Sequence, residues 1–107
     1  MGKTKVGTKA EVPPGKMVGV DVQGKKYVLA NVDGSFYAID GVCPHADGHL
    51  WEGTFNNGVV KCPRHGSEYD VNTGKVLKGP WIPFGKAHDL ETYPIIVEGE
   101  DIFLDLP

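Results

Sequence analysis

Two short runs of cysteine and histidine stand out in this sequence as possible metal ligands. The first is Cys43-Pro44-His45 and the second is Cys62-Pro63-Arg64-His65, with sixteen residues between them. The chain has two cysteines and four histidines, so coincidence is a poor explanation for a histidine close behind each cysteine. Each run offers one soft thiolate and one borderline imidazole. Two loops that bring these runs side by side would deliver a Cys₂His₂ set to one place.

Two kinds of metal centre use two cysteines and two histidines. A structural zinc site accepts this set, but its usual spacing pairs like ligands, as in Cys-x₂₋₄-Cys and His-x₃₋₅-His. A Rieske-type [2Fe–2S] cluster has two histidines in place of two cysteines on one iron, so one ligand of each kind from each loop suits it. A disulfide is a third possibility, but in a reducing cytoplasm thiols flanked by histidines are more plausible as metal ligands.

The residues around both runs resemble the Rieske family of [2Fe–2S] proteins. The resemblance is clearest over residues 36–83 and is carried by residues 43–50, residues 62–71 and Thr73-Gly74-Lys75. Residues 79–83 are similar to the proline loop that covers the cluster in that family. The resemblance implies one Rieske-type [2Fe–2S] cluster with four ligands, Cys43, His45, Cys62 and His65. It also implies that the cysteines bind the buried iron and the histidines bind the outer iron, near the surface.

Two hydroxyl side chains that follow the second run add a further expectation. Ser67 and Tyr69 match positions that, in the respiratory branch of the family, donate hydrogen bonds to a bridging sulfide and to a cysteine sulfur. Such donors stabilise the more negative, reduced cluster and so raise its potential. Gly48 and Arg64, however, stand where that branch carries an extra pair of disulfide cysteines. We expect a potential within the family range of about −150 to +300 mV; turn capping by Ser67 and packing by Tyr69 are the alternative roles.

Other chemically capable side chains are given simpler roles. His49 lies in the first loop, and we expect a polar residue near the cluster rather than a replacement for His45 as ligand. His88 is isolated downstream and is expected at the surface. Trp81 and Phe84 lie in a proline-broken stretch, where a docking patch and core packing are both open interpretations.

The elements that must position these residues are predicted to be short strands. Fifteen glycines and eight prolines suit tight turns rather than long helices, and 40% apolar residues still allow a packed core. Strands are predicted at residues 17–22, 26–32, 35–40, 59–61, 68–71, 75–77, 94–98 and 101–106. Gln23-Gly24 and Asp33-Gly34 are predicted hairpin turns, and residues 72–74 and 99–100 close two more. Residues 41–57 and 62–66, which carry the candidate ligands, are predicted loops.

The strand pattern and the family resemblance together predict an all-β fold. We expect a Rieske-like antiparallel β-sandwich or barrel of short strands, with a cluster-binding subdomain of two loops. A chain of 107 residues has room for a single core. It is therefore interpreted as one Rieske domain over residues 1–107, with the cluster-binding loops at about residues 41–85.

Composition argues against two classes of partner. The formal charge is −3 and no basic cluster is interleaved with aromatics, which argues against nucleic-acid binding. No apolar run approaches the roughly 18 residues of a membrane span, and residues 1–11 are polar, without the hydrophobic region of a signal peptide. We expect a soluble, cytoplasmic protein.

The resemblance implies an electron-transfer protein rather than an enzyme. A soluble Rieske-type ferredoxin carries single electrons from a reductase to a terminal acceptor, in that family often an oxygenase. A 2-His-1-carboxylate set for an oxygen-activating iron is not evident in the remaining residues. Two alternatives stay open: the small subunit of a larger reductase such as nitrite reductase, and a zinc-stabilised binding module without a redox role.

Overall fold

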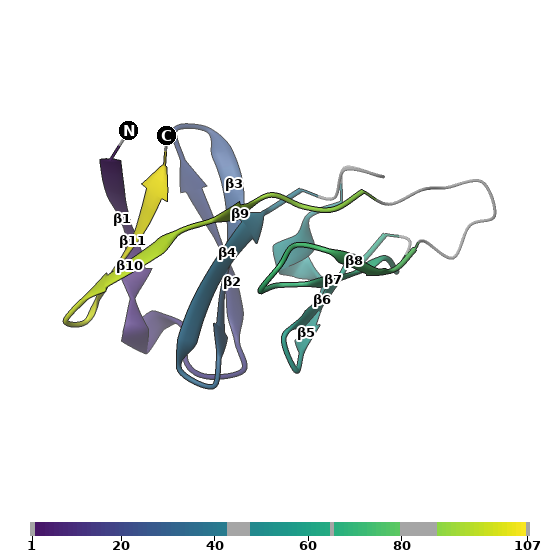
Figure 1. The fold of residues 1–107 in the computed structure, drawn as a ribbon, viewed down its shortest axis with the longest axis horizontal. Helices are drawn as coiled ribbons and strands as arrows, with labels where there is room; N and C mark the ends of the chain where they lie inside the picture. Colours follow the sequence, from purple (N-terminus) through teal and green to yellow (C-terminus); the bar gives the residue numbers. More distant parts are fainter. Residues whose placement is uncertain (1, 43–47, 65, 80–87, 107) are drawn as a thin grey trace.

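The computed structural model describes residues 2–42, 48–64, 66–79 and 88–106, and these ranges are almost entirely strand and turn (Figure 1). The strands in chain order are β1 (Gly2–Thr8), β2 (Met17–Val22), β3 (Lys25–Val32), β4 (Ser35–Asp40), β5 (Thr54–Asn56), β6 (Val59–Lys61), β7 (Glu68–Asp70), β8 (Val76–Lys78), β9 (Thr92–Tyr93), β10 (Ile95–Glu98) and β11 (Asp101–Leu106). Two 3₁₀ helices accompany them in the described ranges, η1 (Lys9–Glu11) and η2 (Leu50–Glu52). No helix in this part of the chain is long and apolar enough to cross a bilayer.

The strands form three antiparallel sheets. Their orders are β1-β11-β10, β2-β3-β4-β9 and β5-β6-β7-β8. The first two sheets pack together into what we call the basal sandwich, and the third, the loop-bearing sheet, lies beside it (Figure 1). The expected all-β antiparallel architecture is confirmed.

Strand β3 joins the two parts because both of its faces are buried. Side chains alternate between the faces of a strand, and here Tyr27 and Leu29 enter apolar clusters with β11 residues of the other basal sheet. Val28 and Ala30 point the opposite way, into a cluster that contains Leu50 and the core of the loop-bearing sheet. The continuous apolar run in β3 therefore reflects two cores that share one strand.

Three hairpins use the same two-residue turn with both residues at positive φ. The φ values are 54° and 86° at Gln23-Gly24, 52° and 93° at Asp33-Gly34, and 51° and 79° at Asn57-Gly58. This backbone matches the right-handed twist of the flanking strands. The first two turns were predicted and are confirmed. The third corrects the prediction of a loop over residues 41–57, since Asn57-Gly58 connects β5 to β6.

Strands β1 and β9 also differ from the sequence prediction. Lys3 and Lys5 on β1 are paired with Asp105 and Phe103 of β11, although the polar sequence lacks the alternation of a half-buried strand. Strand β9 has two residues, paired with Ala38 and Ile39 of β4. Both are defined by their partners rather than by a local pattern. The other predicted strands agree with the structure within one residue at each end.

Candidate metal centre

The second candidate ligand loop connects β6 to β7, and backbone hydrogen bonds join its two ends. The Cys62 N–H donates to the Ser67 carbonyl at 2.8 Å, and the Gly66 N–H donates to the Cys62 carbonyl at 3.2 Å. Cys62 is 1% exposed and belongs to the core cluster that also contains Tyr69. The backbone bonds at the base of the loop hold the Cys62 side chain at the edge of a packed core.

The flanks of the first ligand loop are joined to each other. Val42 and His49 form an antiparallel bridge, and the Leu50 N–H donates to the Gly41 carbonyl at 2.9 Å. Leu50 is fully buried in the same core cluster as Cys62. Burial of Leu50 therefore anchors the returning end of the first loop against the loop-bearing sheet.

Two glycines allow the loops to pack directly on each other. A Cβ at Gly48 would lie 2.7 Å from the Cys62 Sγ, and a Cβ at Gly53 would lie 1.9 Å from the Lys61 carbonyl oxygen. A side chain at either position would clash with the end of β6 or with Cys62 at the start of the second loop. The flanks of the two loops thus lie side by side, as a shared Cys₂His₂ set requires.

Gly48 also meets Arg64, since its Cβ would lie 3.1 Å from the Arg64 Cγ. These are the two positions where the respiratory branch is expected to carry its additional disulfide, and the structure brings them into contact. A hollow of about 340 Å³ opens beside them, lined by Gly48, His49, Glu52, Pro63 and Arg64. Residues of both loops therefore border one recess at the surface.

The structure describes part of the predicted site. Among the predicted residues it describes Cys62, Ser67 and Tyr69, all of them buried. The remaining predicted ligands and the docking-patch candidates, Cys43, His45, His65, Trp81 and Phe84, lie outside the described residues. The described residues alone bring together no group of three or more His, Cys, Asp or Glu side chains able to hold a metal ion.

The environment of the Ser67 hydroxyl shows whether these residues fit a cluster. Ser67 is 0% exposed, and its Oγ has no hydrogen-bond partner among the described residues. A buried hydroxyl without an acceptor costs about 1–3 kcal/mol. It lies on the residue whose carbonyl binds the Cys62 N–H, so a sulfide held next to Cys62 would supply the acceptor. The site fits a [2Fe–2S] cluster in this respect.

Trp51 is a residue of the site that the sequence analysis missed. Its ring stacks on His49 with centroids 4.5 Å apart and planes inclined by 9°. On β2, Gly19 leaves room for the same ring, because a Cβ there would come within 2.5 Å of it. Trp51 thereby fixes η2 to the basal sandwich. His49 is half exposed, with its Nδ1 3.3 Å from Glu52 Oε1, and His88 is exposed as predicted.

The fold and the site together define a class of protein. The described flanks of the two candidate loops meet beside a small sheet that lies outside a β-sandwich, with a buried cysteine and a hydroxyl that lacks an acceptor among the described residues. Hydrogen-bond donors around cysteine sulfur are typical of iron–sulfur proteins, where they tune the reduction potential. The arrangement is that of a small iron–sulfur protein whose cluster is held by loops.

Comparison with known proteins identifies the family. A model of the Rieske [2Fe–2S] domain matches residues 2–94. The chain is 34% identical to the ferredoxin component of a naphthalene 1,2-dioxygenase system from Pseudomonas aeruginosa, over 90% of this chain and 88% of that protein. It is 39% identical to the 3-phenylpropionate/cinnamic acid dioxygenase ferredoxin subunit of Shigella boydii, over 92% and 88% of the two chains. The chain belongs to the Rieske [2Fe–2S] domain family.

A solved structure supports the same assignment. One chain in the complex of reduced oxygenase and oxidized ferredoxin of carbazole 1,9a-dioxygenase superposes with a TM-score of 0.86 and 26% identity. The match covers 96% of the present chain and 92% of that one. The protein is therefore a ferredoxin with a Rieske-type [2Fe–2S] cluster, an electron carrier and not itself an enzyme. The zinc-module interpretation is wrong.

Proposed function

We propose that Cys43, His45, Cys62 and His65 are the four cluster ligands. The support is the burial of Cys62, its contact with Gly48 on the opposite loop, and the bridge that closes the first loop. A buried thiolate suits the iron that is kept from water, and imidazoles lower the negative charge of the centre. We further propose Ser67 and Tyr69 as hydrogen-bond donors to sulfur, since both are fully buried near Cys62.

The bound cluster supplies one-electron chemistry, and the chain's own residues set its conditions. The apolar side chains around Cys62, among them Leu50 and Val60, exclude water from the thiolate. The backbone bond between Cys62 and Ser67 restrains the loop. Pro44 and Pro63 stiffen the two loops at the cost of two N–H donors.

We propose that the protein receives electrons from a reductase and delivers them to a terminal oxygenase. The observation that carries this proposal is the match to ferredoxin components of dioxygenase systems over nearly their full length. The superposed carbazole dioxygenase chain comes from an oxygenase–ferredoxin complex. These relatives favour a separate carrier over the small subunit of a larger reductase. Co-purification with a large reductase subunit would contradict a separate carrier.

The ligand assignment is tested by EPR of the dithionite-reduced protein. Mixed histidine and cysteine ligation is expected to give a lower average g value than that of all-cysteine clusters. His45→Cys and His65→Cys should each lose that spectrum, whereas His88→Cys, the same change at an exposed histidine, should retain it. Metal analysis should find two irons and two acid-labile sulfides per chain. Stoichiometric zinc without iron would overturn the assignment.

We also propose that the chain is one Rieske domain that works in the cytoplasm. The shared β3 strand connects the basal sandwich to the loop-bearing sheet, which supports a single folding unit over residues 1–107. A reducing compartment suits cysteines that act as cluster ligands. Fractionation of the native host followed by immunoblotting tests the location, and recovery from an extracytoplasmic fraction would contradict it.

A further inference from the structure

Asp40 occupies the point where the first ligand loop leaves the basal sandwich. It is the last residue of β4 and precedes Cys43 by three positions. Its carboxylate Oδ2 accepts the Glu91 N–H at 3.0 Å, and its own N–H donates to the Glu91 carbonyl at 3.1 Å. Asp40 is thus paired at both backbone and side chain with a segment 51 residues away.

The second carboxylate oxygen of Asp40 is held by two further side chains. The Tyr93 hydroxyl donates to Oδ1, and the Lys25 ammonium lies 3.5 Å from the same oxygen. Lys25 also donates to the Tyr93 hydroxyl at 2.9 Å and lies over the rings of Tyr27 and Tyr93. Both oxygens of Asp40 therefore have partners, which come from β3, from β9 and from Glu91 just before β9.

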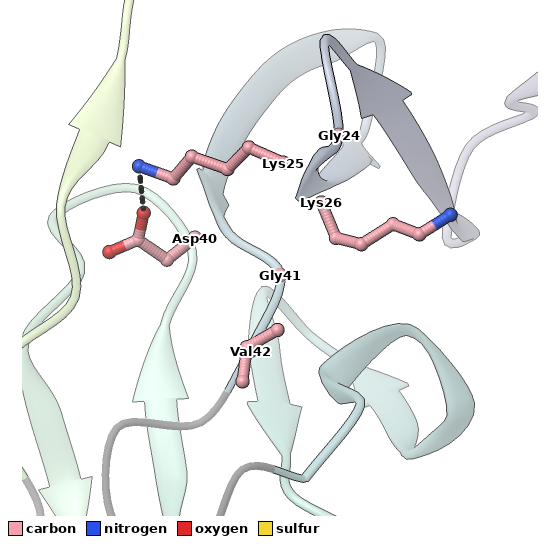
Figure 2. A pocket seen from close by; sticks show the side chains of 6 residues that line it. All are labelled: Gly24, Lys25, Lys26, Asp40, Gly41 and Val42. Atoms are coloured by element: carbon pink, nitrogen blue, oxygen red, sulfur yellow. Dashed lines mark ion pairs between the residues drawn. The ribbon is translucent and has the colours of Figure 1, made fainter.

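Figure 2 shows how the charges of this region are directed. A hollow of about 420 Å³ is lined by Lys25, Lys26, Asp40 and Val42 together with two glycines. The Lys25 ammonium points to Asp40, while the Lys26 ammonium points away on the other side (Figure 2) and pairs with Asp21 at 3.2 Å. The two cations do not converge, so the hollow is not an anion site. Figure 2 shows a directed contact between β3 and the last residue of β4, just before the first ligand loop.

The segment that Asp40 holds is itself attached to the loop-bearing sheet. The Leu90 N–H donates to the Gly74 carbonyl at 2.7 Å, and Leu90 is 5% exposed. Asp89 Oδ1 accepts the Val76 N–H at 2.9 Å. Residues 89–93 therefore contact the turn before β8, the first residue of β8 and the end of β4, from which the first ligand loop continues.

We propose that Asp40 is a positioning residue for the cluster, which acts with Lys25 and Tyr93 to fix the first ligand loop relative to residues 89–93. The proposal rests on the ligand assignment above, in which Cys43 and His45 follow Asp40 by three and five positions in sequence. Contacts outside the ligand loop restrain its backbone. The site then keeps one geometry in both oxidation states, so little structural reorganisation accompanies electron transfer. Such outer support is required for a precise site.

The test compares Asp40→Asn with the parent holoprotein. The Asn amide has one acceptor oxygen where the carboxylate has two, so it cannot accept from both the Glu91 N–H and the Tyr93 O–H as Asp40 does. We expect faster hydrogen exchange of the Glu91 amide, broader EPR lines in the reduced protein and a several-fold slower electron transfer to an artificial acceptor. The matched control is Asp101→Asn, which removes an exposed ion pair with Lys5 at 3.1 Å in the other basal sheet. It should alter none of these readouts.

A second pair of variants separates positioning from a simple charge effect. Lys25→Met breaks the network from the opposite side, so positioning predicts line broadening in this variant as well. A charge effect instead shifts the potential upward in Asp40→Asn and downward in Lys25→Met, with unchanged line shapes, and this outcome would overturn the proposal. If Asp40→Asn fails to fold, Tyr93→Phe removes a single hydroxyl from the network and should still broaden the lines.

Different outcomes refute the ligand assignment and the positioning role of Asp40. If the parent protein lacks the EPR signature of mixed ligation, the ligand assignment fails. If the parent has that signature and neither Asp40→Asn nor Tyr93→Phe changes line shape or transfer rate, the ligand assignment stands and the positioning role is refuted. A lower melting temperature alone, of the size seen in Asp101→Asn, would show a merely structural contact.

Discussion

Gly48 lies against the sulfur of Cys62, across the boundary between the two ligand loops. A Cβ at this position would lie 2.7 Å from the Cys62 Sγ, closer than a Cβ and a sulfur can approach without a clash. The first loop can therefore cover the buried cysteine only if residue 48 has no Cβ. Gly48 is therefore, with Gly53, one of the two glycines on which the close packing of the loops depends.

Gly48→Ala should impair cluster binding more than it impairs the fold. The added methyl must push the first loop away from Cys62, and overpacking of this kind costs about 1–3 kcal/mol. We expect a lower ratio of visible to ultraviolet absorbance after purification and faster loss of colour in a chelator. Gly7→Ala is the matched control, since its Cβ would meet only the flexible Glu11 carboxylate, at 3.2 Å. Equal cluster content in the two variants would contradict the role given to Gly48.

Ser67→Ala should lower the reduction potential, because a hydrogen-bond donor to sulfur stabilises the reduced state. Voltammetry of the variant and the parent measures this shift, and Ser35→Ala, at an exposed serine of β4, provides the control. In the protein without its cluster the same change should be neutral or stabilising by about 1 kcal/mol, because it removes a buried hydroxyl that lacks an acceptor. An unchanged potential would remove Ser67 from the cluster's surroundings.

Gly19→Ala should loosen the junction between η2 and the basal sandwich. A methyl at this position would approach the Trp51 ring to 2.5 Å, so we expect a loss of about 1–3 kcal/mol in the free energy of unfolding. Trp51→Leu removes the obstructing ring and should make Gly19→Ala nearly harmless in the double variant. Urea unfolding of the four proteins gives the coupling energy, and strict additivity would show that the contact does not matter.

Alkaline pH should weaken the network around Asp40. The hydrogen bond to Tyr93 raises the pKa of Lys25 above its usual 10.5. Burial and then the hydrogen bond to Asp40 raise the pKa of Tyr93 above its usual 10.0. Both groups are protonated in the network, so their contribution to stability is full below about pH 10 and is lost as pH rises through the folded-state values.

The size of this alkaline effect should be small and should depend on the Tyr93 hydroxyl. Lys25 is 57% exposed, so the loss is at most about 1 kcal/mol after solvent screening. Urea unfolding at about pH 9 and about pH 11 measures it in the parent and in Tyr93→Phe. The variant should lose less stability between the two pH values. An equal loss in both proteins would place the titration elsewhere.

Strands with a local signal were predictable from sequence, and strands defined by a partner were not. The turns at Gln23-Gly24 and Asp33-Gly34 depend on positive φ at adjacent residues, a preference that two residues express by themselves. Asn57-Gly58 carries the same signal, but strand β5 before it has Phe55 as its one large apolar side chain, too weak a pattern to indicate a strand. Strand β1 has no apolar alternation and forms because β11 is available to pair with it.

The sequence by itself determined the chemistry: two cysteines, each with a histidine at short offset, in a chain of many turns and few helix-forming stretches. Only the tertiary structure decided which residues, far away in sequence, lie next to the candidate ligand loops and support them. Tyr93 and Asp40 are 53 positions apart, and nothing local marks Gly48 as the neighbour of Cys62. Ligand type is a property of single side chains, whereas burial and contact exist only after distant segments of the chain have packed.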